Sequence, residues 1–257
     1  MNSDRPGPLG SNLWVAHRTS HKSPFGSAVN LGPPIDSPFD DGGANVSADG
    51  HLLFFNSDRL TPGVQTDVYV AHRDDTHDDF AWETPVHLGP PVSSAEDEFN
   101  TVPAQGPQCQ GVGLKAKYLA VAGKCLYFVR SPFPTDLYVV ALDRHGVGLG
   151  HAVKLKELSD PQDFEFQPTI RGDGRELYFI RADAVSFGVW VSTREKVSDP
   201  WGAPVAADAL FKAPRPIDSV FLSLDGTTAI IGLVDDAGLT DDLYISTRIQ
   251  NLPHDDE

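Results

Sequence analysis

The chain has little of several features that whole classes of protein depend on. None of its apolar runs reaches the roughly 18 residues that span a bilayer, so no membrane insertion is expected. Lysine and arginine together number only 20, against 36 aspartates and glutamates, which leaves a formal net charge of −16. Phosphate backbones and anionic membrane surfaces repel such a chain, so nucleic acid is not expected as a partner.

Short catalytic and metal-binding motifs are missing as well. The sequence contains no G-x-S-x-G, no phosphate-cradling glycine loop, no C-x-x-C and no H-E-x-x-H. It therefore gives no support for nucleophilic, nucleotide or zinc chemistry. The opening residues, MNSDRPGPLG, also lack the basic and apolar regions of a signal peptide.

Cysteine is scarce, with Cys109 and Cys125 as the two examples. Cys125 lies in the apolar run KCLYFV, typical of a buried strand, and Cys109 in the glycine-rich stretch GPQCQGVG. A disulfide between them is possible in an oxidising compartment. Residues 104–117 lack apolar periodicity, so we expect a mobile surface loop whose deletion leaves the fold intact.

What the sequence does contain is an internal repeat. The segments SNLWVAHR, TDVYVAHR, TDLYVVALDR, FGVWVSTR and DDLYISTR each carry an aromatic residue among β-formers. Neighbouring aromatics are 55, 69, 52 and 54 residues apart, and the longest interval contains Cys109. A period of this length indicates a solenoid or propeller, with an insertion in one repeat. The aromatics are Trp14, Tyr69, Tyr138, Trp190 and Tyr244.

Within a repeat, four short strands follow one another. A first strand leads to a tight turn, for which the Asp-Gly pairs at 49–50, 173–174 and 225–226 are suited. A second strand follows, then the aromatic third strand, then a fourth segment such as WETPVHLG or WGAPVAADAL. Four antiparallel strands per repeat, with almost no helical periodicity, predict an all-β fold in which each repeat is one blade of a β-propeller.

The patterns SADGHLLFFNSDR…DVYVAHR and RGDGRELYFIR…VWVSTR…WGAPV resemble the WD40-like (TolB-type, PD40) β-propeller repeats, often found in bacterial envelope proteins. The resemblance covers essentially the whole chain and implies a periplasmic or secreted location. Little function follows from it, because proteins with unrelated roles share such repeats.

The repeats also set the expected boundaries. We expect one propeller domain over residues 1–257, and we predict five blades, the first of them incomplete because its inner strands would lie upstream of this sequence. The alternative is four blades, with SAVNLG lying outside DLYIST, and the incomplete blade could also mediate self-association. The segments are a partial blade at 1–35, blades at 36–90, 91–157, 158–210 and 211–250, and an acidic tail at 251–257.

An acidic residue precedes or begins each first strand. Asp41 and Glu165 lie eight positions before the Asp of their turn, Asp218 lies seven before, and Glu98 holds a similar place. If first strands line a channel, these carboxylates converge at one mouth, where they raise each other's pKa or bind a hard cation such as Ca²⁺. We therefore predict all four as ligand-binding residues, with Asp41 and Glu165 as possible metal ligands. Ordinary solvated turn residues are the alternative.

Two functions remain open on this basis. The first is a binding module that presents loops and an acidic channel mouth to a protein, peptide or glycan. The alternative is a carbohydrate-active hydrolase or lyase, which needs two carboxyl groups within about 5 to 10 Å of each other. A second recurrent residue, the arginine that ends each third strand, is expected to pair with carboxylates and to serve stability. These arginines are Arg18, Arg73, Arg144, Arg194 and Arg248.

Overall fold

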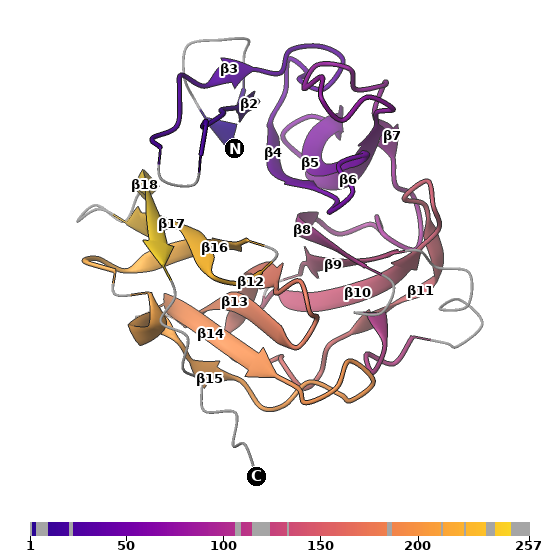
Figure 1. Ribbon diagram of the computed structural model, residues 1–257. Helices are drawn as coiled ribbons and strands as arrows, with labels where there is room; N and C mark the ends of the chain where they lie inside the picture. Colours follow the sequence, from indigo (N-terminus) through magenta and orange to yellow (C-terminus); the bar gives the residue numbers. More distant parts are fainter. Residues whose placement is uncertain are drawn as a thin grey trace.

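The strands are arranged around a ring in chain order (Figure 1). The computed structural model describes residues 2–3, 10–20, 23–105, 109–114, 124–132, 134–183, 187–211, 213–223, 225–234 and 240–247. The predicted acidic tail at 251–257 and Arg248 lie outside this part of the chain. The described strands form five antiparallel sheets, three with four strands and two with three.

The sheets at the two ends of the chain have three strands each. The first sheet consists of β1 (Asn2–Ser3), β2 (Asn12–Val15) and β3 (Val29–Asn30). The last sheet consists of β16 (Ile217–Leu222), β17 (Thr228–Val234) and β18 (Thr240–Thr247).

The three sheets between them are complete blades. They are β4 (Asp41–Val46), β5 (Leu52–Thr61), β6 (Gln65–His72) and β7 (Val86–His87); β8 (Glu98–Gln105), β9 (Lys124–Arg130), β10 (Asp136–Leu142) and β11 (Gly148–Lys154); and β12 (Phe164–Ile170), β13 (Glu176–Ala182), β14 (Phe187–Thr193) and β15 (Val205–Ala206). A short 3-10 helix, η2 (Asp208–Leu210), follows β15.

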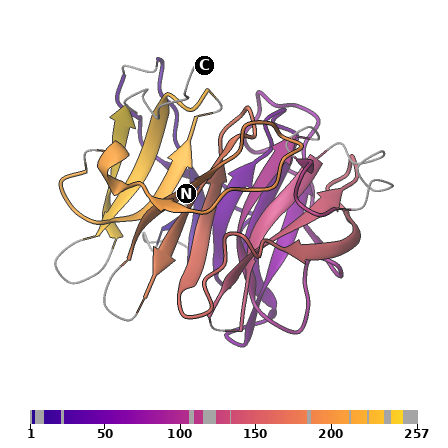
Figure 2. The ribbon, with the colours of Figure 1, turned by 90° about the horizontal axis from the view of Figure 1, so that it is seen from below.

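The fold is the predicted all-β propeller, with the four sheets from β4 to β18 standing as blades in a ring. The first sheet is much smaller, because β1 and β3 have two residues each. The ring is therefore four-bladed, as the alternative expected, and the five-bladed plan is not confirmed. The detailed four-bladed alternative is wrong in one respect: β3 pairs with β2, through Trp14 and Asn30, and not with β18. Seen from below, the indigo first sheet and the yellow last sheet lie at the same side of the molecule (Figure 2).

The Asp-Gly turns join first to second strands as expected. Gly50, Gly174 and Gly226 all have positive φ, at 79°, 72° and 67°. This backbone region suits glycine, since it has no Cβ to clash with the preceding carbonyl. In the first of these turns, Ser47 Oγ donates to Asp49 Oδ1 at 2.6 Å. In these three blades the turn therefore fixes the register in which the first strand pairs with the second.

Apolar side chains pack between successive sheets. The first sheet and the β4–β7 blade share a core around Leu13, Phe55 and Tyr69. Three further clusters join β4–β7 to β8–β11, β8–β11 to β12–β15, and β12–β15 to the last sheet. Among the described residues, none of these core clusters joins the last sheet to the first.

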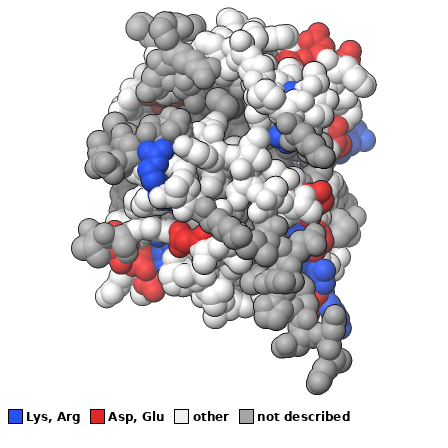
Figure 3. All heavy atoms as spheres, turned by 60° about the vertical axis from the view of Figure 1, so that its left-hand side comes forward, with Lys and Arg blue, Asp and Glu red and all other residues white. Residues whose placement is uncertain are grey.

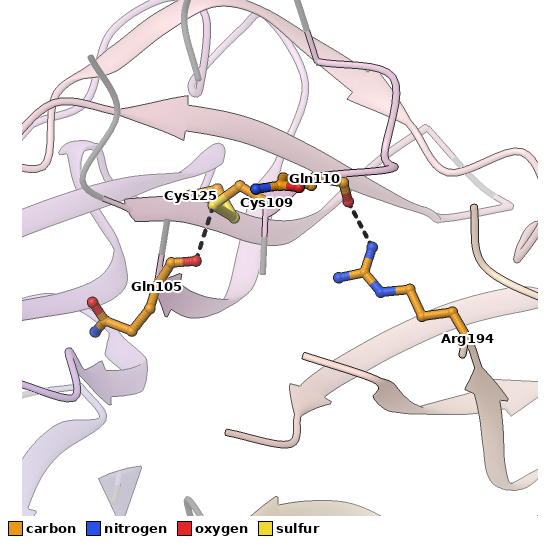
Figure 4. The surroundings of a disulfide bond; sticks show 5 residues. All are labelled: Gln105, Cys109, Gln110, Cys125 and Arg194. Atoms are coloured by element: carbon orange, nitrogen blue, oxygen red, sulfur yellow. Dashed lines mark hydrogen bonds between the residues drawn. A yellow bond between two sulfur atoms is a disulfide. The ribbon is translucent and has the colours of Figure 1, made fainter. Parts of the chain in front are cut away.

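Residues 104–117 differ from the expected mobile loop where they are described. Ala104 belongs to β8, and Cys109 and Val112 are buried in the core between two blades. Cys109 and Cys125 form a disulfide with Cα atoms 5.8 Å apart (Figure 4). The backbone carbonyl of Gln110 accepts a hydrogen bond from Arg194 of the next blade at 2.6 Å. This segment is therefore a structural contact, and the expectation that it can be deleted harmlessly has no support.

The described chain contains no helix with the length and apolar character needed to cross a membrane.

Candidate functional site

Three of the four predicted acids are buried in ion pairs. Asp41, Glu98 and Glu165 are each 0% exposed. Each pairs with an arginine near the end of its neighbouring second strand, at 2.6 Å for Arg59, 2.7 Å for Arg130 and 2.9 Å for Arg181, respectively. Asp41, Glu98 and Glu165 are therefore not open to a ligand, and they are not solvated turn residues either.

The arginine of each pair has the same surroundings in all three blades. The guanidinium also donates to a backbone carbonyl in the segment before the first strand. Arg130 and Arg181 use Nη2 for this, to Val92 and Leu158, and Nε for the carboxylate. Arg59 uses one nitrogen, Nη2, for both Ile35 and Asp41. Each guanidinium also lies 4.7 to 5.4 Å from the centres of two aromatic rings, one on the second strand and one on the third. The set of carboxylate, carbonyl and two rings satisfies a buried charge, so the repeat is structural.

Asp218 does not belong to this set. Ile217 pairs with Leu233 at the position where Glu165 pairs with Arg181, and both apolar residues are buried. Asp218 lies one residue further along and is half-buried, and desolvation raises the pKa of its carboxyl. The seven-residue distance to the turn, against eight in the other blades, already indicated this offset.

The described residues offer no metal site. No three or more His, Cys, Asp or Glu side chains of the described ranges are grouped so that they could hold an ion. Asp41 and Glu165 are engaged with Arg59 and Arg181. The possible Ca²⁺ site at Asp41 and Glu165 is therefore not supported.

Two of the third-strand arginines, Arg73 and Arg194, bind mainly aromatic rings and backbone carbonyls. Arg73 and Arg194 each lie 4.2 Å from the centre of a tryptophan ring, Trp82 and Trp201. Both also donate from Nε to the carbonyl of the glycine in an Asp-Gly turn, at 2.8 and 2.7 Å. Arg73 has a carboxylate partner, Asp79, at 3.5 Å. The predicted role in stability fits these contacts, although backbone carbonyls supply more of them than carboxylates do.

A large cleft lies where the core clusters leave a gap, between the first and last sheets. Its volume is about 2010 Å³, and it extends to the first strands of all four blades, β4, β8, β12 and β16. Residues of both end sheets line it together, including Trp14, Phe25, Leu243, Tyr244 and Ile245. Of the four predicted acids, only Asp218 is among its lining residues.

The inner end of the cleft is polar. Asn100 and Gln167, at 48° and 53°, have positive φ next to bulges in their first strands. Such bulges turn a side chain away from the regular alternation of a strand. Asp40, Asp97 and Asp218 also line the cleft, and the first two accept hydrogen bonds from the backbone amides of Ser11 and Thr66. This end therefore presents amide groups and negative charge.

The outer end of the cleft is apolar. Leu243, Tyr244 and Ile245 of β18 are 48%, 40% and 47% exposed, and Phe25 on the opposite wall is 43% exposed. Figure 3 shows the molecule from this side, where most of the described surface belongs to residues other than Lys, Arg, Asp and Glu. Three consecutive exposed apolar residues on a strand at the edge of its sheet are typical of an interaction site.

These cleft residues were not predicted from the sequence. Trp14 and Tyr244 stand out there only as markers of the repeat. A signal was available, however, because the sequence contains five aromatic third strands and four of the fourth segments. The strand left without a fourth segment is the one around Tyr244.

We expect the pH dependence of folding to change when Glu165 is replaced by Gln. Burial raises the pKa of the Glu165 carboxyl from 4.5 to about 7, and hydrogen bonds from Asp160 and Arg181 only partly offset this. Because the folded state favours the protonated acid, Glu165 stabilises the fold fully below its unfolded pKa, and this contribution is lost as pH rises through the folded pKa. Urea unfolding at several pH values should show the wild type losing stability over this range relative to Glu165→Gln.

Glu98→Gln is the matched control for this prediction. Both Glu98 oxygens accept hydrogen bonds, from Ser94 and Arg130. For Glu165, by contrast, no donor in the described chain reaches Oε2. Glu98→Gln should therefore change the slope of unfolding free energy against pH less than Glu165→Gln does. Equal slopes for the wild type and Glu165→Gln would contradict the prediction.

Comparisons with known proteins agree on the fold. No family model matches the chain, and no curated protein matches it. Among solved structures, an endo-arabinase from Bacteroides thetaiotaomicron is 14% identical, with a TM-score of 0.53, over 81% of this chain and 74% of its own. TolB from Acinetobacter baumannii is 12% identical, with a TM-score of 0.45, over 86% of this chain and 43% of its own.

The chain thus spans less than half the length of that TolB structure. An α-L-arabinofuranosidase from Lactobacillus brevis is similar over 80% of this chain and 70% of its own, with 9% identity and a TM-score of 0.48. The endo-arabinase, with a TM-score above 0.5, supports the same architecture, and at 14% identity the likeness carries no activity. The chain is therefore placed by its fold, as a β-propeller.

Proposed function

We propose that this protein is a binding module that takes a polypeptide ligand in the cleft between its first and last sheets. The single observation that carries the proposal is the outer edge of β18. No other strand of the described chain pairs with this edge, and its three consecutive apolar residues are about half exposed. A polypeptide can satisfy both the backbone groups and the apolar side chains of such an edge, whereas a glycan offers little for the apolar ones.

The distribution of charge supports the same proposal. The inner end of the cleft holds Asp40, Asp97 and Asp218, in a chain with a net charge of −16. A ligand whose inner end is positively charged would complement these carboxylates. The negative charge of the protein would also attract such a ligand before contact. The ligand class is therefore a polypeptide with apolar side chains toward β18 and a basic end toward Asp218.

The carbohydrate-active alternative has less to support it. It requires two carboxyl groups in different environments across a sugar. Asp41, Glu98 and Glu165 are bound to arginines. Of the carboxyl groups that do line the cleft, those of Asp40 and Asp97 already accept hydrogen bonds from backbone amides. The disulfide fits a periplasmic or secreted location, where such bonds persist, and we include that location in the proposal.

Selection from a random peptide library displayed on phage tests the proposal. Peptides selected on the wild-type protein should bind it on the order of micromolar Kd and should bind Ile245→Lys at least about ten-fold more weakly. Val205→Lys is the matched control, because Val205 is 55% exposed on β15 and is not among the residues lining the cleft. Failure to enrich any peptide, or equal binding to Ile245→Lys, would contradict the proposal.

A further inference from the structure

Four sheets contain an outermost strand, whereas no strand of the described residues pairs with the outer edge of β18. In the first four sheets, the outermost strand pairs with the third strand in one common register. The residue that follows the third-strand aromatic is a valine, and its partner on the outermost strand is also a valine in every case. These pairs are Val15–Val29, Val70–Val86, Val139–Val153 and Val191–Val205.

The backbone contacts of these outermost strands repeat as well. Two residues after each of the paired valines, a backbone N–H donates to the carbonyl of the residue that precedes the third-strand aromatic. The four hydrogen bonds are Leu31 to Leu13, Leu88 to Val68 and Leu155 to Leu137, each at 2.9 Å, and Ala207 to Val189 at 2.7 Å. The register is therefore set by the same two interactions in all four sheets.

An aromatic residue precedes the valine in three of the four strands. Phe25, Trp82 and Trp201 each lie four positions before it. Each ring is covered by the arginine that ends the third strand, at 4.9 Å for Arg18 and 4.2 Å for Arg73 and Arg194. The residue immediately before the valine is alanine or proline in all four strands. The outermost strands thus share the pattern aromatic-x-x-(Ala/Pro)-Val-x-(Leu/Ala), with leucine in place of the aromatic in one of them.

The last sheet has the third strand of this arrangement, β18, with its outer edge unpaired among the described strands. Tyr244 and Ile245 are the counterparts of Tyr69 and Val70, but they are 40% and 47% exposed, whereas Tyr69 and Val70 are 5% and 4% exposed. In the sequence Arg248 follows Tyr244 by four residues, the spacing of Arg73 from Tyr69. In Figure 1, β18 stands at the edge of its sheet beside the first sheet. The exposure of β18 therefore corresponds to an outermost position that no described strand fills.

We propose that the edge of β18 binds an extended segment of another protein that carries the pattern aromatic-x-x-(Ala/Pro)-Val-x-(Leu/Ala). The inference rests on the proposed function and states its ligand and binding mode. The segment adds to the last sheet as an antiparallel fourth strand, with its valine opposite Ile245. The N–H two residues after this valine donates to the carbonyl of Leu243.

A different protein is favoured over a second copy of this chain. All four segments with this pattern are already paired within their own sheets, so a donated copy would leave its own sheet without an outermost strand. Two chains with a net charge of −16 each also repel one another. The occupant is thus a partner that carries the pattern on an exposed segment.

A synthetic peptide with the sequence of residues 81–89, AWETPVHLG, probes the strand pattern alone, because it has no basic end that would face Asp218. We expect it to bind the wild-type protein and to protect the backbone amides of β18 from hydrogen exchange. Methylation of the peptide nitrogen at the leucine removes the donor to Leu243 and should weaken binding about ten-fold. Methylation at the histidine is the matched control, because alternate amides of an antiparallel strand point away from the partner strand, and it should leave the affinity unchanged.

The outcomes separate this inference from the proposed function. If the peptide binds without protecting β18, or if both methylated peptides bind equally, strand addition is wrong while a polypeptide-binding cleft stands. If phage-selected peptides bind the cleft and AWETPVHLG does not, the ligand pattern is wrong. Light scattering that shows a concentration-dependent dimer, abolished by Ile245→Lys, would assign the edge to a second copy. The methylated peptides are tested on the unaltered protein, so the result does not depend on how well a variant folds.

Discussion

Replacing Arg130 by Ala is expected to destabilise the protein by about 3 to 5 kcal/mol, because it leaves a buried carboxylate without its counter-charge. Glu98 is 0% exposed, and Arg130 Nε donates to its Oε1 at 2.7 Å. Arg130 also donates to the carbonyl of Val92 at 2.6 Å and stacks against Phe128 and Tyr138. Urea unfolding at neutral pH would measure the loss.

The last sheet supplies the compensating variant for this prediction. It has Ile217 and Leu233 at the positions of Glu98 and Arg130, and both are buried. The double variant Glu98→Ile with Arg130→Leu should therefore recover most of the loss, since no charge is left unpaired. Arg175→Ala, which removes an exposed partner of Asp173, should cost less than about 1 kcal/mol. If Arg130→Ala also lowered the free energy of unfolding by less than about 1 kcal/mol, a structural role for the Glu98–Arg130 pair would be contradicted.

Removing the disulfide is the second large change, with an expected loss of about 3 kcal/mol. Cys109 and Cys125 are 16 residues apart in the sequence, and both are 0% exposed. Without the bond, the unfolded chain gains the freedom of that loop, and the segment that places Gln110 against Arg194 loses its covalent anchor. Replacing both cysteines by Ala and comparing denaturant midpoints would measure the effect.

A control separates the covalent bond from the contact that it supports. Arg194 donates to the carbonyl of Gln110 and to that of Gly174 in its own blade. Reducing agent applied to the wild-type protein should lower stability as much as the double Cys→Ala variant does, and it should have no effect on that variant. An unchanged midpoint in the double variant would show that packing alone holds residues 109–114 in place.

The sequence was enough to predict the architecture. Aromatic residues at a regular spacing, Asp-Gly turns and alternating apolar strands are local features, and a propeller uses each of them in the same way in every blade. The sequence left the disulfide between Cys109 and Cys125 open as a possibility, and the structure forms it.

The roles of the acids could not be read from the sequence in the same way. In the sequence, an acidic residue at the start of a strand that faces a channel cannot be distinguished from one that faces a neighbouring arginine. Glu165 finds Arg181 only because the hairpin between β12 and β13 places them opposite each other. Asp218 lies one residue out of this register, so the same residue type half-faces the cleft. Successive side chains of a strand lie on opposite faces of the sheet. An error of one residue in the distance from the turn therefore places a side chain on the wrong face.

What the sequence by itself determined is the repeat, the all-β propeller and the count of third and fourth strands, because these depend on short-range patterns. Only the tertiary structure decided that Asp41, Glu98 and Glu165 are buried in ion pairs, and that Leu243, Tyr244 and Ile245 are left exposed beside the first sheet. Both depend on which sheets come to lie next to each other. In a ring, the neighbours of the last sheet are set by how the blades close, and no local segment contains that information.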